Sequence, residues 1–174
     1  GYMVGDFVRD KDAVTSTLLA CEIAADAKAN GSSFYKELID CYVDYGYYKE
    51  HLVSLTKKGI SGAEEIKQML KDFKENPVVS VAGSKVKWIE DYNTSIAKNV
   101  ITGEEKNIDI PKSNVLIYET EDGTRIAARP SGTEPKVKFY ISTNAKLDKA
   151  KKFKKVGKEL DAKIARILSE LKLG

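Results

Sequence analysis

The segment "NVLIYETEDGTRIAARPSGTEPKVKFYIS" (residues 114–142) decides the fold, because polar and apolar residues alternate along it in three runs. The runs cover residues 115–120, 124–128 and 137–141, and each is rich in the branched and aromatic residues that strands favour. The turn sequence "EDGT" separates the first two runs, and the loop "RPSGTEP" separates the last two. The segment therefore predicts an antiparallel meander of three strands.

Two long amphipathic segments are predicted to be the helices that cover this sheet. Residues 61–76 carry apolar side chains at helical spacing and stop before Pro77, and residues 145–173 have an apolar stripe with lysines opposite. An antiparallel sheet needs cover on one face, and these two helices can supply it. The sequence therefore predicts the α+β class, with an antiparallel sheet covered by helices on one face.

The first 46 residues differ from the rest, since their pattern predicts two helices and no strand. Gly46 separates them from strand-like sequence, so we predict two domains, residues 1–46 and 47–174. The chain opens in loop-like sequence without an initiator methionine. We therefore expect a piece of a longer chain, in which residues 1–46 end the preceding domain.

The composition is typical of a globular protein that works away from membranes. The 174 residues are 42% hydrophobic and 32% charged, and no run approaches the length of a membrane-spanning helix. Cys21 and Cys41 lie in helical patterns and lack metal or redox spacing, so we predict core thiols in a reducing compartment. A cytoplasmic location is the expectation.

The loop between the second and third predicted strands concentrates groups that bind anions. Arg129 offers a planar fork of donors, Ser131 and Thr133 offer hydroxyls, and Gly132 permits a positive φ that would turn successive amides toward one anion. Lys138 lies close by on the following strand. The residues also leave open a plain hairpin turn with an incidental arginine.

Three other features of the sequence are candidate sites. Residues 146–172 hold ten basic and four acidic residues, which suits RNA, but the lysines also fit the solvated face of an amphipathic helix. Asp10 and Asp12 have a spacing seen in metal sites, yet no further ligand is near, so a helix-capping role is preferred for Asp12. His51 is the one histidine, and a structural role is favoured for it.

Two segments carry a resemblance to a known family. "GTRIAARPSGTEPKVKFYI" (residues 123–141) closely resembles the phosphate-binding loop in the C-terminal domain of the α-D-phosphohexomutases, the phosphoglucomutase/phosphomannomutase family. "GDFVRDKDAV" (residues 5–14) is similar to the end of that family's third domain. The resemblance covers essentially the whole chain and implies the end of domain 3 followed by domain 4.

The resemblance implies a fold like that of the TATA-binding protein and an enzyme that interconverts hexose 1-phosphates and 6-phosphates. In this family a phosphoserine, one Mg²⁺ and a bisphosphate of the glucose 1,6-bisphosphate type take part, while the C-terminal domain grips the phosphate that is not reacting. Carried over, the grip falls on Arg129, Ser131, Gly132 and Thr133, with Lys138 in support. Lys11 resembles a basic residue at the family's cleft, although a solvated charged turn explains it equally well.

The family's serine loop and its metal loop have no counterpart in this sequence, and Gly1 and Tyr2 are at most the last residues of its sugar-specificity loop. We therefore expect no catalytic residue and no metal site here, no mutase activity of this chain alone, and no indication of which hexose is preferred. The expected partners are a phosphosugar and the remaining domains of the same polypeptide, without nucleic acid or membrane. The alternative is a non-enzymatic module that binds anions or RNA through the basic C-terminal helix.

Overall fold

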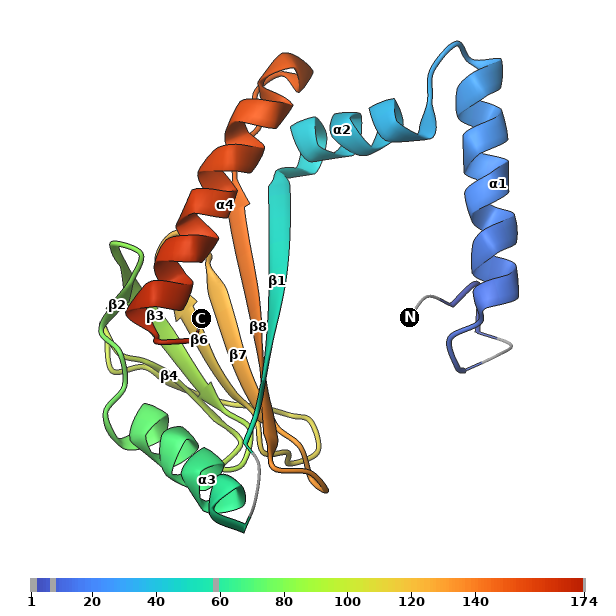
Figure 1. Ribbon diagram of the computed structural model, residues 1–174. Coiled ribbons are helices and arrows are strands. Elements are labelled where there is room, and N and C mark those ends of the chain that lie inside the picture. Colours follow the sequence, from blue (N-terminus) through green and yellow to red (C-terminus); the bar gives the residue numbers. More distant parts are fainter. Residues whose placement is uncertain (1–2, 7–8, 58–59, 174) are drawn as a thin grey trace. The chain divides into compact units, whose positions relative to one another are not determined.

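A computed structural model describes residues 3–6, 9–57 and 60–173. The chain divides into two compact units, residues 1–46 with 147–153, and residues 47–146 with 154–174 (Figure 1). The candidate site belongs to the second unit.

The first unit is helical. It contains α1 (Ala13–Ala29), α2 (Phe34–Tyr45) and the short 3₁₀ helix η1 (Ala150–Lys152). The ring of Phe153 stacks on Tyr42 and meets Tyr35 edge to face. Asp12 caps α1 by accepting a hydrogen bond from the Val14 amide at 2.8 Å, which confirms the preferred interpretation of this residue.

The two cysteines do not lie in a core. Cys21 and Cys41 are both free and exposed, so the prediction of buried thiols was wrong for this structure. The physical reason is that α1 and α2 present apolar side chains on several sides, and a unit built of so few helices cannot cover them all.

The second unit is built on an antiparallel sheet. Within the described residues its strands follow the order β1-β8-β7-β6-β3-β4-β5, and β2 pairs with β3 off this path. Their bounds are Tyr47–Thr56 (β1), Ser80–Val81 (β2), Ser84–Asp91 (β3), Ile96–Asn99 (β4), Glu105–Asn107 (β5), Leu116–Thr120 (β6), Arg125–Pro130 (β7) and Lys136–Ala145 (β8). The predicted meander is thus β6, β7 and β8.

The helices α3 (Ile60–Glu75) and α4 (Phe153–Glu170) lie on the same face of this sheet (Figure 1). Alternate residues of each central strand point toward them, so Val137 and Phe139 of β8 are buried in one core with Ile66 of α3 and Ile167 of α4. The opposite face of the sheet carries the intervening residues. The predicted α+β class, with helices covering one face, is therefore confirmed.

One predicted boundary was wrong. The last helix was expected from residue 145, but β8 extends to Ala145 and α4 begins only at Phe153. Residues 142–145 remain strand because they pair with β1, from Glu50↔Ser142 to Tyr47↔Ala145. Sequence periodicity alone could not reveal this partner, which lies about a hundred residues earlier.

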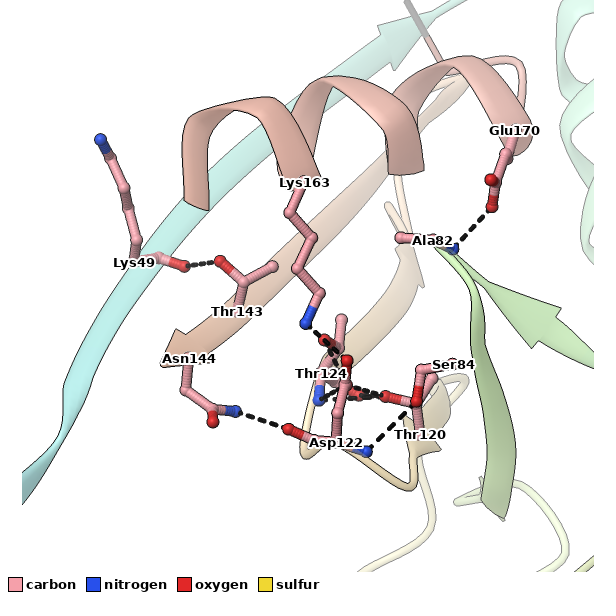
Figure 2. A network of polar contacts seen from close by, with 10 residues as sticks. All are labelled: Lys49, Ala82, Ser84, Thr120, Asp122, Thr124, Thr143, Asn144, Lys163 and Glu170. Carbon is pink, nitrogen blue, oxygen red and sulfur yellow. Dashed lines mark hydrogen bonds and ion pairs between the residues drawn. The ribbon is translucent and has the colours of Figure 1, made fainter. Parts of the chain in front are cut away.

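The polar side of α4 is attached to the turn between β6 and β7 (Figure 2). Lys163 donates to the Asp122 carboxylate at 2.8 Å, and the same carboxylate accepts hydrogen bonds from the hydroxyls of Thr120 and Thr124. Burial opposes ionisation of Asp122, but these bonds outweigh it and lower its pKa from 3.8 to about 2. The turn and the helix are thereby locked to each other.

A second polar contact attaches α4 to the turn between β2 and β3 (Figure 2). The Glu170 carboxylate accepts from the Ala82 amide at 2.6 Å and is paired with Arg166 at 2.7 Å. Ala82 has φ of 49°, a conformation that costs energy for a residue with a Cβ, so this bond supports a turn that is otherwise unfavourable. Together the two contacts fix the position of α4 along the sheet.

We predict that Asp122→Asn removes an acid-sensitive part of the stability. A carboxylate whose pKa is lowered on folding stabilises the fold above its unfolded pKa near 3.8, and the contribution is lost as the pH falls through about 2. The shift corresponds to roughly 2 kcal/mol, which solvent screening of the 42% exposed side chain reduces to about 1 kcal/mol or less.

Urea unfolding between pH 2 and 6 measures this. The difference in unfolding free energy between the wild type and Asp122→Asn should be present at pH 6 and shrink toward zero near pH 2. Asp109→Asn, a change at an exposed loop residue, is the control and should leave the profile unchanged. A difference that does not vary with pH would contradict the assignment.

Candidate functional site

A shallow hollow of about 230 Å³ lies where β7 passes through the predicted loop into β8. It is open on the sheet face opposite the helices, because its strand residues alternate with the buried ones. Its lining residues are Arg129, Pro130, Ser131, Gly132, Glu134, Lys136, Lys138 and Tyr140. The structure thus gathers four of the predicted site residues around one concave surface.

The register of β7 and β8 sets the arrangement of the cations. Arg129 is the direct cross-strand partner of Lys138, and Lys136 lies two residues before Lys138 on the same side of the strand. Within the part of the chain that the structure describes, none of these three side chains forms an ion pair. By contrast, Arg125 of the same strand is paired with both Glu90 and Glu119.

This contrast locates the uncompensated charge. Like charges placed directly across a pair of strands repel each other, which costs stability unless an anion neutralises them. Among the described residues that line the hollow, Glu134 is the one acidic residue, against the three cations Arg129, Lys136 and Lys138. The geometry and charge therefore suit an oxyanion, and Arg129 offers it the paired donors that phosphate or carboxylate oxygens accept.

The loop is held by its own hydrogen bonds rather than shaped as the predicted amide nest. The Ser131 hydroxyl accepts from the amides of Thr133 and Glu134, at 3.4 and 3.3 Å, and the Ser131 amide donates to the Lys136 carbonyl at 2.7 Å. Gly132 does not have a positive φ. The nest was therefore a wrong prediction, since three of its four amides already have partners.

Gly132 nevertheless leaves room for a close approach. A Cβ built on it meets nothing within 4 Å, so the backbone at this point is open to solvent. Thr133 is also exposed, but it does not line the hollow. The Thr133 amide donates to the Ser131 hydroxyl, and the role of the Thr133 side chain in a phosphate grip stays a prediction.

Tyr140 lines the hollow and was missed by the sequence argument. The signal was present, because residues 136, 138 and 140 alternate with the buried positions 137, 139 and 141. Tyr140 is 41% exposed and adds an aromatic surface to a basic site.

Other candidate residues lie elsewhere. Lys11 belongs to the first unit, where it is exposed and forms an ion pair with its neighbour Asp10 at 2.7 Å, so its role at a cleft stays a prediction. His51 is exposed on the edge strand β1. Gly1 and Tyr2, considered as the end of a sugar loop, lie outside the described residues.

The described ranges contain neither a cluster of metal ligands nor a membrane-spanning helix. No group of three or more His, Cys, Asp or Glu side chains that could hold a metal ion occurs there. No helix in those ranges is long and apolar enough to cross a membrane.

The second unit is thus an antiparallel α+β domain with a basic hollow on the uncovered face of its sheet. The chain belongs to the phosphoglucomutase/phosphomannomutase family, since the model of the "Phosphoglucomutase/phosphomannomutase, C-terminal domain" matches residues 57–156. The resemblance noted in the sequence is confirmed.

Curated relatives agree with this assignment. A phosphoglucomutase of Staphylococcus aureus strain MRSA252 is 40% identical over 142 residues, which is 82% of this chain and 26% of the relative. That of strain MSSA476 is 37% identical over 164 residues, 94% of this chain and 29% of the relative. That of Staphylococcus saprophyticus is 35% identical over 142 residues, with the same coverage as the first. The chain therefore spans between a quarter and a third of the length of these relatives.

Among solved structures, the open form of pp63/parafusin, a phosphoglucomutase from Paramecium, aligns with 92% of this chain and 28% of its own. Its TM-score is 0.47 and its sequence identity is 16%.

We predict that Gly132→Ala does not destabilise the fold. Without a positive φ and with open space at the Cβ position, alanine fits, and a less flexible unfolded chain should raise stability by about 0.5 kcal/mol. Gly123→Ala is the matched comparison, because Gly123 has φ of 79° and its Cβ would lie 2.9 Å from the side-chain nitrogen Nδ2 of Asn144.

Urea unfolding of the two variants separates the cases. Gly123→Ala should lower the unfolding free energy by about 1 kcal/mol or more. A loss of similar size in Gly132→Ala would show that this glycine needs the left-handed conformation after all.

Proposed function

We propose that residues 47–174 are the phosphate-gripping C-terminal domain of a phosphohexomutase, which interconverts hexose 1-phosphate and 6-phosphate. Residues 1–46 would then end the preceding domain of the same polypeptide. The observation that carries the proposal is the hollow lined by Arg129, Lys136 and Lys138, whose charges have no counter-ion within the described residues. Membership of the phosphoglucomutase/phosphomannomutase family supports it.

The grip is assigned to Arg129, Ser131, Gly132 and Thr133, with Lys138 in support. Arg129 and Lys138 donate charge-assisted hydrogen bonds to the phosphate oxygens, each contributing about 1.5–3 kcal/mol before desolvation. The Gly132 amide can donate where no side chain blocks the approach. The Ser131 hydroxyl accepts hydrogen bonds within the turn, so its own hydrogen is available for donation to the phosphate. The exposed Thr133 hydroxyl can donate from beside the hollow.

A remote grip of this kind serves catalysis through binding energy. Holding the unreactive phosphate orients the sugar, so that the other end meets the reacting groups in a productive geometry. Because the cations recognise only phosphate, the same grip accepts the 1-phosphate and the 6-phosphate. That property suits a cycle through a phosphoserine and a bisphosphate of the glucose 1,6-bisphosphate type.

The transfer itself is assigned to other parts of the polypeptide. When bound, Mg²⁺ neutralises charge on a transferring phosphoryl group. The described residues of this chain do not fit such a site, because they contain no group of carboxylate, histidine and cysteine ligands. We assign this chain no step through the metal, and we propose a cytoplasmic enzyme whose hexose preference is set outside residues 129–140.

We predict that glucose 1,6-bisphosphate binds at the hollow and not on α4. In an amide chemical-shift titration of the 174-residue chain, residues 129–138 should respond. Arg129→Ala should weaken binding roughly tenfold or more, since it removes a charge-assisted contact. Arg125→Gln is the matched control, because it removes an arginine from the same strand and face that is already paired with Glu90 and Glu119. The affinity for glucose 1,6-bisphosphate should therefore be unchanged.

Chemical-shift changes confined to the helix that carries Lys154, Lys155 and Lys158, without any change at residues 129–138, would contradict the proposed phosphate grip. That result would favour the alternative of an anion- or RNA-binding module on the basic helix. A further sign of it would be RNA binding that weakens steeply with salt.

We also predict that this chain alone has no mutase activity. The purified chain is incubated with glucose 1-phosphate, Mg²⁺ and glucose 1,6-bisphosphate, and glucose 6-phosphate is followed through a coupled dehydrogenase. An intact phosphoglucomutase serves as the positive control. Mg²⁺-dependent turnover by the chain itself, above a heat-treated sample, would overturn the assignment of the chemistry to other domains.

A further inference from the structure

The open face of the sheet is organised in rows that run across the strands. Because paired residues point to the same side, the register of β1, β8, β7 and β6 places side chains of that face in line. Consecutive rows are two residues apart along each strand, which is roughly 6.6–6.8 Å. Three such rows lie between the loop and the middle of the sheet.

The row nearest the loop is cationic. Among the rows that cross β1, β8 and β7, it runs from Ser54 through Lys138 to Arg129, and it forms the wall of the phosphate site beside Lys136. Lys138 and Arg129 carry hydrogen-bond donors and no acceptor, so they suit the oxygens of a phosphate.

The next row is apolar. It runs from Leu52 through Tyr140 and Ala127 to Ile117. Tyr140 is 41% exposed and Leu52 is 51% exposed, although both lie on a sheet whose other face is a tightly buried core. Tyr140 also lines the hollow, so the apolar row is continuous with the cationic one.

The third row is polar, and its arginine is already paired with carboxylates. Here Arg125 is the cross-strand partner of both Ser142 and Glu119, and its guanidinium is paired with Glu119 and Glu90. Among its described residues the third row therefore offers no unpaired cation to a second phosphate, and it marks the far limit of the apolar strip.

We propose that Tyr140, flanked by Leu52 and Ala127, is a subsite for the apolar face of the hexose ring whose phosphate occupies the neighbouring hollow. This inference rests on the proposed phosphate grip and extends it to the sugar. A pyranose presents C–H groups on its faces and hydroxyls around its edge, and an exposed aromatic ring packs against such a face. The small side chain of Ala127 leaves the tyrosine ring accessible on the β7 side.

The order of the rows matches the order of groups in the ligand. A phosphate on the cationic row places the attached ring about one row further along the sheet, which is where Tyr140 lies. Stacking imposes no pattern of donors and acceptors, so the subsite accepts a ring that carries its phosphate on either carbon. A tyrosine therefore orients the sugar plane without fixing which end faces the reacting centre.

The test compares inorganic phosphate with glucose 6-phosphate on the 174-residue chain, by chemical-shift titration of the wild type and Tyr140→Ala. We expect the variant to bind glucose 6-phosphate roughly fivefold to tenfold more weakly, and inorganic phosphate within about twofold of the wild type. Tyr140→Phe keeps the ring and should restore the affinity for glucose 6-phosphate. Tyr48→Ala removes another exposed tyrosine, located two rows beyond Leu52 on β1, and should change neither affinity.

The outcomes separate the subsite from the grip. If residues 129–138 do not respond to inorganic phosphate, the phosphate grip fails and the subsite fails with it. If inorganic phosphate binds normally, but Tyr140→Ala lowers the affinity for both ligands equally or changes neither affinity, the sugar subsite alone is overturned. A selective loss for glucose 6-phosphate, rescued by phenylalanine, supports it.

Discussion

The pairing of β7 with β8 is the constraint on which the rest of the second unit depends. Its register directs Val137 and Phe139 into the core beneath α3 and α4, and by the same geometry directs Lys138 to the open face opposite Arg129. A slip of one residue would exchange the two sets, so the core and the site cannot be specified independently. The burial of the apolar set therefore provides the free energy that holds the cations together.

The polar contacts of α4 reinforce this arrangement from the covered face. Lys163 holds the turn that joins β6 to β7, and Glu170 holds the turn that joins β2 to β3 (Figure 2). Acidic side chains thus have defined partners around α4, whereas the hollow on the open face keeps a surplus of positive charge. That distribution favours a binding role for the surplus, because folding alone would be better served by pairing it.

Much of this could be predicted from the sequence, because alternation and helical periodicity are local patterns. The meander, the covering helices and the position of Arg129 beside Ser131 followed from them. The start of α4 did not, since residues 142–145 are strand only through pairing with β1. The conformation of Gly132 and the partners of the Ser131 hydroxyl depend on turn geometry that several sequences can adopt, and the exposure of Cys21 depends on which surfaces surround its helix. The outward orientation of Tyr140 could be predicted from the alternation, but its place in a site depends on the position of the hollow, which the structure supplies.

The most direct test of the central claim is a crystal structure of the chain with glucose 6-phosphate. The predicted result is a phosphate within hydrogen-bonding distance of the Arg129 guanidinium and the Lys138 ammonium, with the sugar ring lying over Tyr140. A phosphate bound instead among Lys154, Lys155 and Lys158 of α4, with the hollow at residues 129–138 empty of ligand, would contradict it.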